Sequence, residues 1–272
     1  MDKKNYTLEE IKADCSELWQ KVLEMYLNRK KQREIIEELG VTRAKIDHFV
    51  ARYGLTRFRD KNLYCLDSSV IDINNPNYCY FLGFFAADGN IHLTNSGSEI
   101  IQFTLKDKEP LEDIKKMFRY TGEIKEYKKA GEKKYFFLGI TNKKLVESIK
   151  SIFGEVYRKT SILAYPKFPN KDCESMFLRG YWDGDGCFTL SQNRRTYIGE
   201  CYCDSPAFLK GLCDCLDRNN IHYTTGNKYL RFLTNSAVTD FINYIYNYKS
   251  YIGLPRKRGL AFLHLFYSKE MI

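Results

Sequence analysis

The sequence predicts an α+β fold made of two similar halves, with a small helical segment in front of them. Three observations support it: a helical pattern in the first 55 residues, an internal repeat in the remainder, and the same alternation of helices and strands in both copies. Each copy is expected to run helix, strand hairpin, helix, strand hairpin, helix. Two such copies in one chain predict a pseudo-dimer with internal twofold symmetry.

Length and composition limit the class of protein. The 272 residues suffice for one large domain or two to three small ones, and 44% apolar residues can form a proper core. We find no run of about 18 apolar residues that could cross a membrane and no apolar core of a signal peptide at the start. Nine cysteines with scattered spacing indicate reduced thiols in a cytoplasmic compartment. A formal net charge of +9 favours a polyanionic partner.

The first 55 residues are expected to form helices. Residues 7–27 have the apolar spacing of one helix, which Thr7 can begin. A second apolar stripe ends at Gly40, and Thr42 can cap a further helix that ends at Gly54. Residues 56–77 lack periodicity and contain turn residues, so they are predicted to be a linker between this domain, 1–55, and the repeats.

The two short helices around Gly40 resemble a helix-turn-helix. The second of them carries a basic outer face, because its exposed side is expected to present Arg43, Lys45, His48 and Arg52. These four residues are the expected DNA contacts of the domain. The alternative is a helical hairpin whose charged face is only solvated.

The internal repeat appears when the sequence is shifted by 97 positions. "FLGFFAADGNIHLT" (81–94) then lies over "LRGYWDGDGCFTLS" (178–191), with Asp88 on Asp185. The same shift sets Asp107 on Asp204 further along. We therefore expect a first repeat over 78–172 and a second over 173–272.

Small residues recur on one face of both expected motif helices. Gly83 and Ala87 are four residues apart in the first copy, as are Gly180 and Gly184 in the second. This spacing clears one helix face and allows a partner backbone to approach closely. The sequence therefore predicts that the two motif helices pack on each other.

The acidic residues Asp88 and Asp185 then lie at equivalent helix C-termini. The helix dipole disfavours a carboxylate there by up to about 1 kcal/mol, and two adjacent carboxylates also repel. A divalent cation would relieve both effects, which predicts a metal-binding pair. The alternative is that each aspartate only ends its helix beside a capping glycine. The repetition of the pattern favours the metal.

Residues 81–89 and 178–186 resemble the nine-residue signature of LAGLIDADG homing endonucleases in their single-chain, two-motif form. The resemblance covers residues 78 to about 265. It implies a saddle of antiparallel strands over double-stranded DNA, with both motif helices at the pseudo-twofold axis of a monomer.

The resemblance also implies a metal site. Asp88 and Asp185 would bind Mg²⁺ or another divalent cation such as Mn²⁺, and the carbonyls of Ala87 and Gly184 would be further ligands. The sixth motif position is Ala86 in one copy and Asp183 in the other, whereas the eighth is acidic in both. We therefore expect two competent half-sites.

Two lysines are the expected cations of the reaction. Lys134 and Lys228 are predicted to begin equivalent strands. Near each metal-binding aspartate they would stabilise the charge on the reacting phosphate or orient water.

Polar residues alternate along the strands after each motif, which suits a β-ribbon in a major groove. The expected DNA contacts are His92, Thr94, Gln102, Thr104, Thr189, Ser191, Gln192, Arg194, Arg195 and Thr196, with Arg256 and Lys257 on backbone phosphates. The alternative for the hairpin tip around Arg194 is a solvated turn.

These expectations together describe a site-specific endonuclease. Hydrolysis of one phosphodiester on each strand would break a long DNA target and support mobility of an intron or similar element. Two alternatives remain on the same scaffold: a DNA-binding regulator that has lost cleavage, and an RNA-binding intron maturase. Retention of both motif acids argues against the first.

Overall fold

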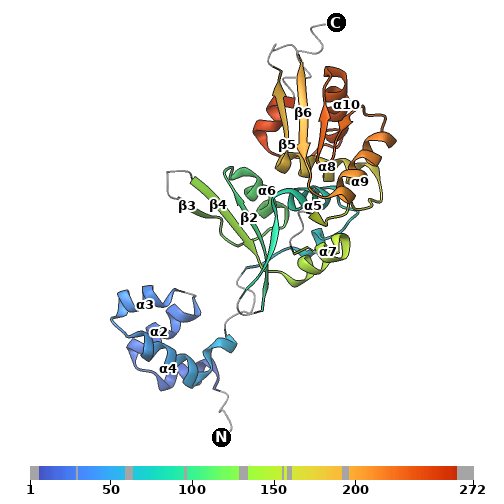
Figure 1. Cartoon of the computed structure of the whole chain (residues 1–272). Coiled ribbons are helices and arrows are strands. Elements are labelled where there is room, and N and C mark those ends of the chain that lie inside the picture. Colours follow the sequence, from blue (N-terminus) through green and yellow to red (C-terminus); the bar gives the residue numbers. More distant parts are fainter. Residues whose placement is uncertain are drawn as a thin grey trace. The chain divides into compact units, whose positions relative to one another are not determined.

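The computed structural model describes residues 6–28, 30–58, 64–94, 97–128, 134–154, 156–157, 161–191 and 196–261. Its contacts divide the chain into two compact units, Met1–Leu63 and Tyr64–Ile272 (Figure 1). The expected helical domain falls in the first unit, and both expected repeats fall in the second. Among the described helices, none combines the length and the hydropathy needed to cross a membrane.

The first unit is helical. Its helices are α1 (Leu8–Asp14), α2 (Glu17–Leu27), α3 (Gln32–Leu39) and α4 (Arg43–Tyr53), followed by a short 3-10 turn, Leu55–Phe58. Gly40 and Gly54 end α3 and α4 with left-handed φ values of 65° and 58°, so both predicted ends are confirmed. Thr42 takes the N-cap position of α4, although its side chain makes no capping hydrogen bond.

The single helix expected over 7–27 is wrong, because the chain breaks at Cys15 and Ser16. Both residues are extended, and Ser16 occupies the N-cap position of α2. The Gln20 side chain donates to the carbonyls of Lys12 (2.9 Å) and Cys15 (3.2 Å). These bonds satisfy backbone groups that a continuous helix would have paired internally, and they stabilise the break.

The second unit contains two copies of the order αββαββα, as predicted. The first copy comprises α5 (Pro76–Asp88), β1 (Asn90–Leu93), β2 (Glu99–Leu105), α6 (Glu109–Met117), β3 (Lys125–Lys128), β4 (Lys134–Ile140) and α7 (Lys143–Phe153). The second comprises α8 (Lys171–Asp185), β5 (Gly186–Leu190), β6 (Tyr197–Tyr202), α9 (Pro206–Arg218), β7 (Thr224–Thr225), β8 (Tyr229–Phe232) and α10 (Asn235–Ile245). Residues 255–261 form a further short helix.

Each repeat has one antiparallel four-stranded sheet. The strand orders are β1-β2-β4-β3 and β5-β6-β8-β7, so the two sheets have the same topology. The expected alternation holds in β2, where Ile101 and Phe103 are buried while Thr104 is exposed on the other face. One face of each sheet therefore packs on the core and the other is available for a partner.

The motif helices α5 and α8 pack directly on each other where the two repeats meet (Figure 1). A Cβ atom on Gly83 would overlap the carbonyl oxygen of Phe177, and one on Gly180 would overlap the carbonyl oxygen of Tyr80. No side chain fits between these backbones. The predicted pairing through small residues is confirmed.

The segment before α5 belongs to the second unit. Tyr64, Leu66, Val70, Ile71 and Ile73 pack against the core of the repeats, and Ser68–Val70 forms a 3-10 turn. The C-terminal half of the expected linker, 56–77, is therefore an integral part of this unit.

Candidate active site

The motif aspartates end the paired helices. Asp88 and Asp185 are the last residues of α5 and α8, and both are exposed. A Cβ on Gly184 would lie 3.1 Å from Oδ2 of Asp88 and would overlap the Cβ of Ala87. The helices thus stay in contact to their last turns, which brings both carboxylates to the same end of the pair.

The glycines after the motifs serve close packing. Gly89 and Gly186 have φ values of −79° and −81°, so neither adopts the left-handed conformation of a common helix cap. A Cβ at Gly186 would overlap the indole of Trp182, and one at Gly89 would overlap the Phe85 ring. Each glycine lets the chain turn from the aspartate straight into a strand.

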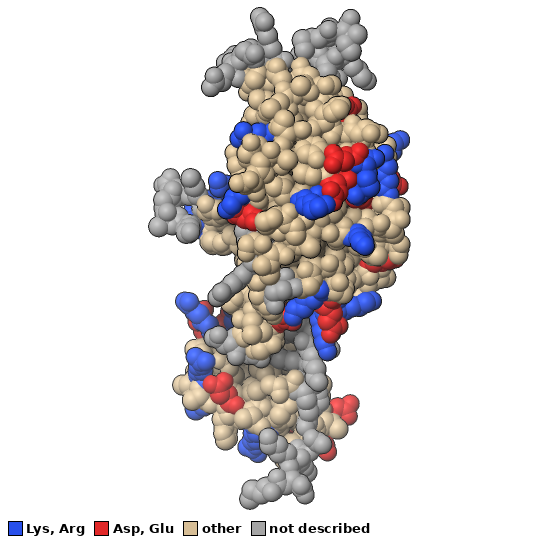
Figure 2. Space-filling view, turned by 45° about the vertical axis from the view of Figure 1, so that its right-hand side comes forward, with Lys and Arg blue, Asp and Glu red and all other residues tan. Residues whose placement is uncertain are grey.

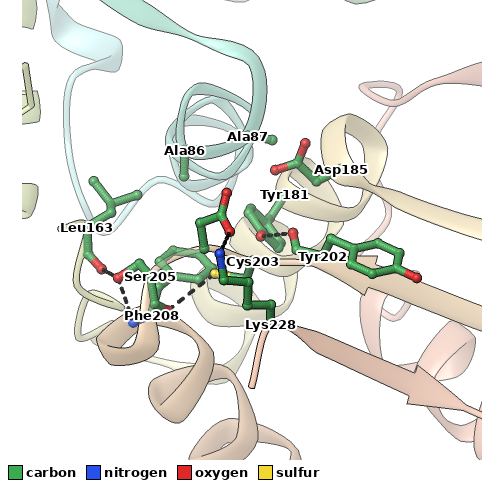
Figure 3. A pocket seen from close by; sticks show the side chains of 11 residues that line it. Ala86, Ala87, Leu163, Tyr181, Asp185, Tyr202, Cys203, Ser205, Phe208 and Lys228 are labelled. Carbon is green, nitrogen blue, oxygen red and sulfur yellow. Dashed lines mark hydrogen bonds and ion pairs between the residues drawn. The ribbon is translucent and has the colours of Figure 1, made fainter. Parts of the chain in front are cut away.

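A cavity of about 430 Å³, the second-repeat cleft, surrounds Asp185 (Figure 3). Lys228 and Asp204 also line it, and the Lys228 Nζ lies 2.8 Å from Oδ1 of Asp204. Ala86 and Ala87 of α5 close one side. The cleft therefore combines the motif carboxylate, a second carboxylate and a cation.

A matching cavity of about 510 Å³, the first-repeat cleft, surrounds Asp88. Asp107 and Arg256 line it, and Nε of Arg256 donates to Oδ2 of Asp107 at 2.9 Å. Its outer wall includes Thr104 and Tyr135. This cleft has the same three kinds of group, but the cation paired with its second carboxylate comes from the C-terminal segment, and Lys106 adds a further cationic side chain to the lining.

The sequence carried a signal for the second carboxylate of each cleft. Asp107 and Asp204 coincide under the repeat shift of 97, yet sequence reasoning gave them no role. Each now holds the cationic side chain of its cleft in place.

The strand register explains why the two cations differ. Cys201 faces Leu230, as Phe103 faces Leu138, and both pairs are buried. Two residues further along, the Cys203 amide donates to the Lys228 carbonyl (2.9 Å), where the first repeat sets Leu105 against Phe136. Lys228 is therefore the counterpart of Phe136 and not of Lys134.

Lys134 lies elsewhere. Its Nζ lies 2.8 Å from a carboxylate oxygen of Glu126 on β3, and it is not among the residues that line the first-repeat cleft. Lys134 begins β4 and Lys228 directly precedes the equivalent strand β8, as predicted. The register nevertheless sets them two residues apart, and only Lys228 lines a cleft.

Lys257 is buried at the end of α8, with 4% of its surface exposed. Its Nζ lies within hydrogen-bonding distance of the carbonyl oxygens of Trp182 (2.8 Å), Asp183 (2.7 Å), Gly184 (3.1 Å) and Gly186, which share its three N–H groups. The ammonium offsets the negative end of the helix dipole beside the motif aspartates. Lys257 is thus occupied with the backbone, although we expected it to contact DNA phosphate. The carbonyl of Gly184, an expected metal ligand, already accepts one of these bonds.

Asp183, the sixth motif position of the second repeat, is buried and holds separate segments of the chain together, so we call it a clamp. Asp183 accepts hydrogen bonds from the Tyr80 hydroxyl on α5 and from the Leu254 amide, both at 2.9 Å. Burial raises the pKa of Asp183, and these hydrogen bonds oppose that shift. The clamp ties the C-terminal segment to both motif helices, which places Arg256 at the first-repeat cleft.

The donor set of the clefts suits a hard divalent cation. Asp88 and Asp185 present exposed carboxylates, which Mg²⁺ prefers to nitrogen or sulfur ligands. Within the described ranges, no cluster of three or more His, Cys, Asp or Glu residues could enclose a metal. A Mg²⁺ ion held here would therefore complete its shell with water and substrate phosphate, as this ion commonly does.

The outer faces of the sheets carry the expected DNA-binding residues. His92, Thr104 and Thr189 are exposed, and Thr94, Gln102, Ser191 and Thr196 are partly exposed. Gln192, Arg194 and Arg195 lie outside the described residues. Sequence reasoning missed Arg231 on the same face, whose guanidinium donates to Glu200 at 2.9 Å and to the Tyr202 hydroxyl at 3.0 Å. The strand alternation of β8 could have identified it.

Positive charge is interspersed with negative charge on the surface. On the face shown in Figure 2, coloured Lys and Arg side chains lie next to Asp and Glu side chains. The pairing of Lys228 with Asp204 and of Arg256 with Asp107 follows this pattern. A polyanion at the clefts would compete with these carboxylates for the same cations.

The basic face of the first unit is present as expected. Arg43, Lys45, His48 and Arg52 are all exposed on α4. Arg43 and Arg52 form long ion pairs with Asp47 (3.8 Å) and Asp14 (3.6 Å). Such exposed pairs contribute little to stability, so the cations stay available to a partner.

A comparison with protein families agrees with the internal repeat. A family model described as a LAGLIDADG-like domain matches residues 77–154 and 172–245. Among solved structures, the homing endonuclease I-WcaI bound to its DNA recognition sequence is 15% identical with a TM-score of 0.49 (67% of this chain, 84% of that chain). The I-LtrWI LAGLIDADG homing endonuclease bound to target DNA is 15% identical with a TM-score of 0.45 (74% and 92%). Full-length DUF199/WhiA from Thermatoga maritima is 18% identical with a TM-score of 0.43 (66% and 61%).

One curated relative also matches. The glutamine–fructose-6-phosphate aminotransferase (isomerizing) of Methanocaldococcus jannaschii is 24% identical over 140 residues, which cover 49% of this chain. The match spans only 12% of that relative's length. It therefore carries no argument about aminotransferase activity.

Proposed function

The chain belongs to the LAGLIDADG-like domain family, and on that premise we propose that it is an endonuclease that breaks both strands of a long, specific DNA target. The observation that carries the proposal is the pair of clefts at one end of the packed motif helices. Each cleft contains a motif aspartate, a second aspartate and a cationic side chain that is paired with the second aspartate. Two such clefts in a monomer match the two strands of a duplex.

The residues of the two clefts have different roles in the proposed phosphodiester hydrolysis. Asp88 and Asp185 would hold Mg²⁺, or Mn²⁺, at the helix ends. A divalent cation bound there supplies a Lewis acid that activates water and stabilises a phosphate oxygen. Lys228 and Arg256 add positive charge where the phosphate becomes more negative, and Asp204 and Asp107 orient these two side chains.

The sheets and the first unit would bind the target. Residues such as His92, Gln102 and Thr189 lie on the open sheet faces, where a β-ribbon can read a major groove. The biological role proposed with this activity is mobility of an intron or similar element. The alternatives are a DNA-binding regulator without cleavage and an RNA maturase. The presence of a motif aspartate, a second aspartate and a cationic side chain in both clefts favours the nuclease.

Cleavage of a complex DNA library tests the proposal. Full-length protein is incubated with fragmented genomic DNA and Mg²⁺, and the new ends are sequenced. We expect paired ends on opposite strands at one long sequence, no ends when EDTA removes the metal, and recovery with excess Mg²⁺ or Mn²⁺. Stable binding to a unique DNA sequence without new ends would favour the regulator. Selective binding of RNA would favour the maturase.

The two cation side chains should act on different strands. Lys228→Met is expected to slow cutting at the second-repeat cleft by about a hundredfold, and Arg256→Met to slow the first-repeat cleft similarly, because each removes charge stabilisation from one site. End-labelled duplexes measure each strand separately. Lys134→Met is the matched control, since its ammonium pairs with Glu126 outside the cleft. Equal slowing of both strands by either variant would contradict the assignment.

The basic face of α4 should contribute phosphate contacts. Replacing Arg43, Lys45 and Arg52 together with Gln is expected to weaken DNA binding and to reduce the slope of log affinity against log salt by about 0.9 per lost contact. Arg33→Gln is the control, because Arg33 lies on α3 and is 88% exposed with a Glu37 partner. An unchanged slope in the triple variant would make the first unit a structural appendage.

A further inference from the structure

The second repeat contains a cavity separate from both clefts. It measures about 490 Å³ and is lined by three cationic residues and no acidic one: Arg179, Tyr246, Tyr248, Lys249, Ser250, Tyr251 and Arg258. None of these residues lines the cleft around Asp88 or the cleft around Asp185. The concentration of positive charge in one cavity needs an explanation beyond the proposed nuclease.

Arg179 is the most unusual of the lining residues. It lies in the middle of α8 with only 1% of its surface exposed. One of its terminal nitrogens donates to the Ile252 carbonyl, and within the described part of the chain the other contacts the Met176 sulfur at 3.9 Å. Its Nε is buried and has no hydrogen-bond partner among the described residues. A buried N–H of a cation without an acceptor is strongly unfavourable, so this group is suited to an incoming oxygen.

The loop packs tightly against one edge of this guanidinium. A Cβ atom on Gly253 would lie 2.6 Å from Nη2 and 3.2 Å from Nε of Arg179, so only glycine fits at this position. Asp113 accepts from the Gly253 amide at 3.2 Å, and Asp183 accepts from the Leu254 amide. Both carboxylates also lie close enough to interact with the charge of Arg179, but neither lines the cavity. The Tyr246 ring supports the guanidinium from one side at 4.7 Å.

The cavity arises where the second repeat departs from the first. Arg179 corresponds to Leu82 under the repeat shift of 97, and Leu82 is a fully buried core residue. The loop after α10 has eight residues, 246–253, before Leu254, whereas two residues, 154–155, separate α7 from the corresponding Val156. The first repeat reaches the same strand and helix order without either feature. Two independent departures that meet at one cavity indicate a specialised site.

We propose that this cavity binds a phosphate group or a similar oxyanion. Arg179 lines the cavity, and its guanidinium has donor capacity left at Nε, which has no partner among the described residues, and at Nη1, whose partner is the weak sulfur acceptor of Met176. Guanidinium N–H groups form strong charge-assisted hydrogen bonds to phosphate oxygens. Lys249 and Arg258 supply further positive charge from the loop and from the C-terminal helical residues. The phosphate belongs either to a free anion or to the backbone of a bound nucleic acid.

Titration with inorganic phosphate tests the site on the full-length protein. Calorimetry at constant ionic strength, with chloride as the reference anion, should show saturable binding, and phosphate should raise the unfolding midpoint. Arg179→Leu, which copies the first repeat, and Arg258→Gln should each weaken phosphate binding about tenfold or more, because each removes a charged donor. Lys143→Gln on α7, a side chain that is 89% exposed, should bind phosphate like the parent.

Several results decide the question. If Arg179→Leu fails to fold, Lys249→Gln and Arg258→Gln carry the test, since neither side chain is fully buried. Absence of saturable phosphate binding, or equal binding by the parent and by these variants, would overturn the proposal. These readouts do not involve DNA cleavage, so they stand or fall separately from the nuclease.

DNA binding then identifies the source of the phosphate. If the backbone of DNA occupies the cavity, Arg258→Gln weakens DNA binding, lowers its salt slope by about 0.9, and inorganic phosphate competes with DNA. If the ligand is a free anion, the same variant loses phosphate binding and keeps its DNA affinity. Both outcomes support an oxyanion site.

Discussion

Asp88→Asn and Asp185→Asn should each abolish double-strand cleavage while the protein still folds and binds DNA. Both carboxylates are exposed at the ends of α5 and α8, so the isosteric amide leaves the helix packing unchanged. The amide cannot supply the negative charge that a divalent cation requires. The loss should therefore fall on the reaction and spare the complex with DNA.

A supercoiled plasmid carrying the target distinguishes the outcomes. We expect at least about a thousandfold slower formation of linear DNA in Mg²⁺, with DNA affinity in Ca²⁺ within about threefold of the parent. Asp214→Asn on α9, where the carboxylate pairs with Lys210, is the matched control and should cut normally. Normal linearisation by either motif variant would refute the assignment of these aspartates.

The features that sequence predicted well depend on local patterns. The four-residue spacing of Gly83 with Ala87, and of Gly180 with Gly184, is enough to specify a helix face that accepts another backbone. The period-two alternation of β2 is likewise local, and Ile101 and Phe103 are buried accordingly. Repetition of both patterns in one chain then predicts the pseudo-dimer.

The features that sequence missed depend on contacts between distant segments. Lys257 is basic and lies in a basic stretch, so composition indicates a phosphate contact; only the fold brings it to the carbonyls at the end of α8. Asp183 likewise acquires its role from Tyr80 and Leu254, which are 103 and 71 residues away. A motif alone does not indicate where the C-terminal segment returns.

Strand register is the other source of error. The sequence pattern aligns Lys134 with Lys228, whereas the hydrogen-bonded register aligns Lys228 with Phe136, two residues further along β4. A shift of two residues keeps a side chain on the same face of the sheet but moves it by about 7 Å along the strand. The buried pair Cys201 and Leu230 fixes the register in the structure. Arg256 then supplies to the first-repeat cleft the cation that Lys134 was expected to supply.

Substitution of the helix-contact glycines should have the largest effect on folding. Gly180→Leu places a side chain where the Tyr80 carbonyl and the Phe84 amide already lie, and even its Cβ overlaps this backbone. Gly83→Leu meets the Phe177 carbonyl and the Tyr181 amide in the same way. Overpacking typically costs 1–3 kcal/mol, and a clash with backbone on both sides should reach about 3 kcal/mol or more, because neither helix can move a side chain aside.

The motif helices also carry the site, so stability and cleavage should fall together in these variants. Separation of α5 from α8 moves Asp88 away from Asp185, and metal-dependent hydrolysis tolerates little change in ligand position. We expect Gly180→Leu to lower the unfolding midpoint by about 5–10 °C and to eliminate cutting. Gly259→Ala is the control, because a Cβ at Gly259 meets no atom within 4 Å. A Gly180→Leu protein that unfolds at the parent temperature and still cuts would show that the two helices do not join the repeats as described.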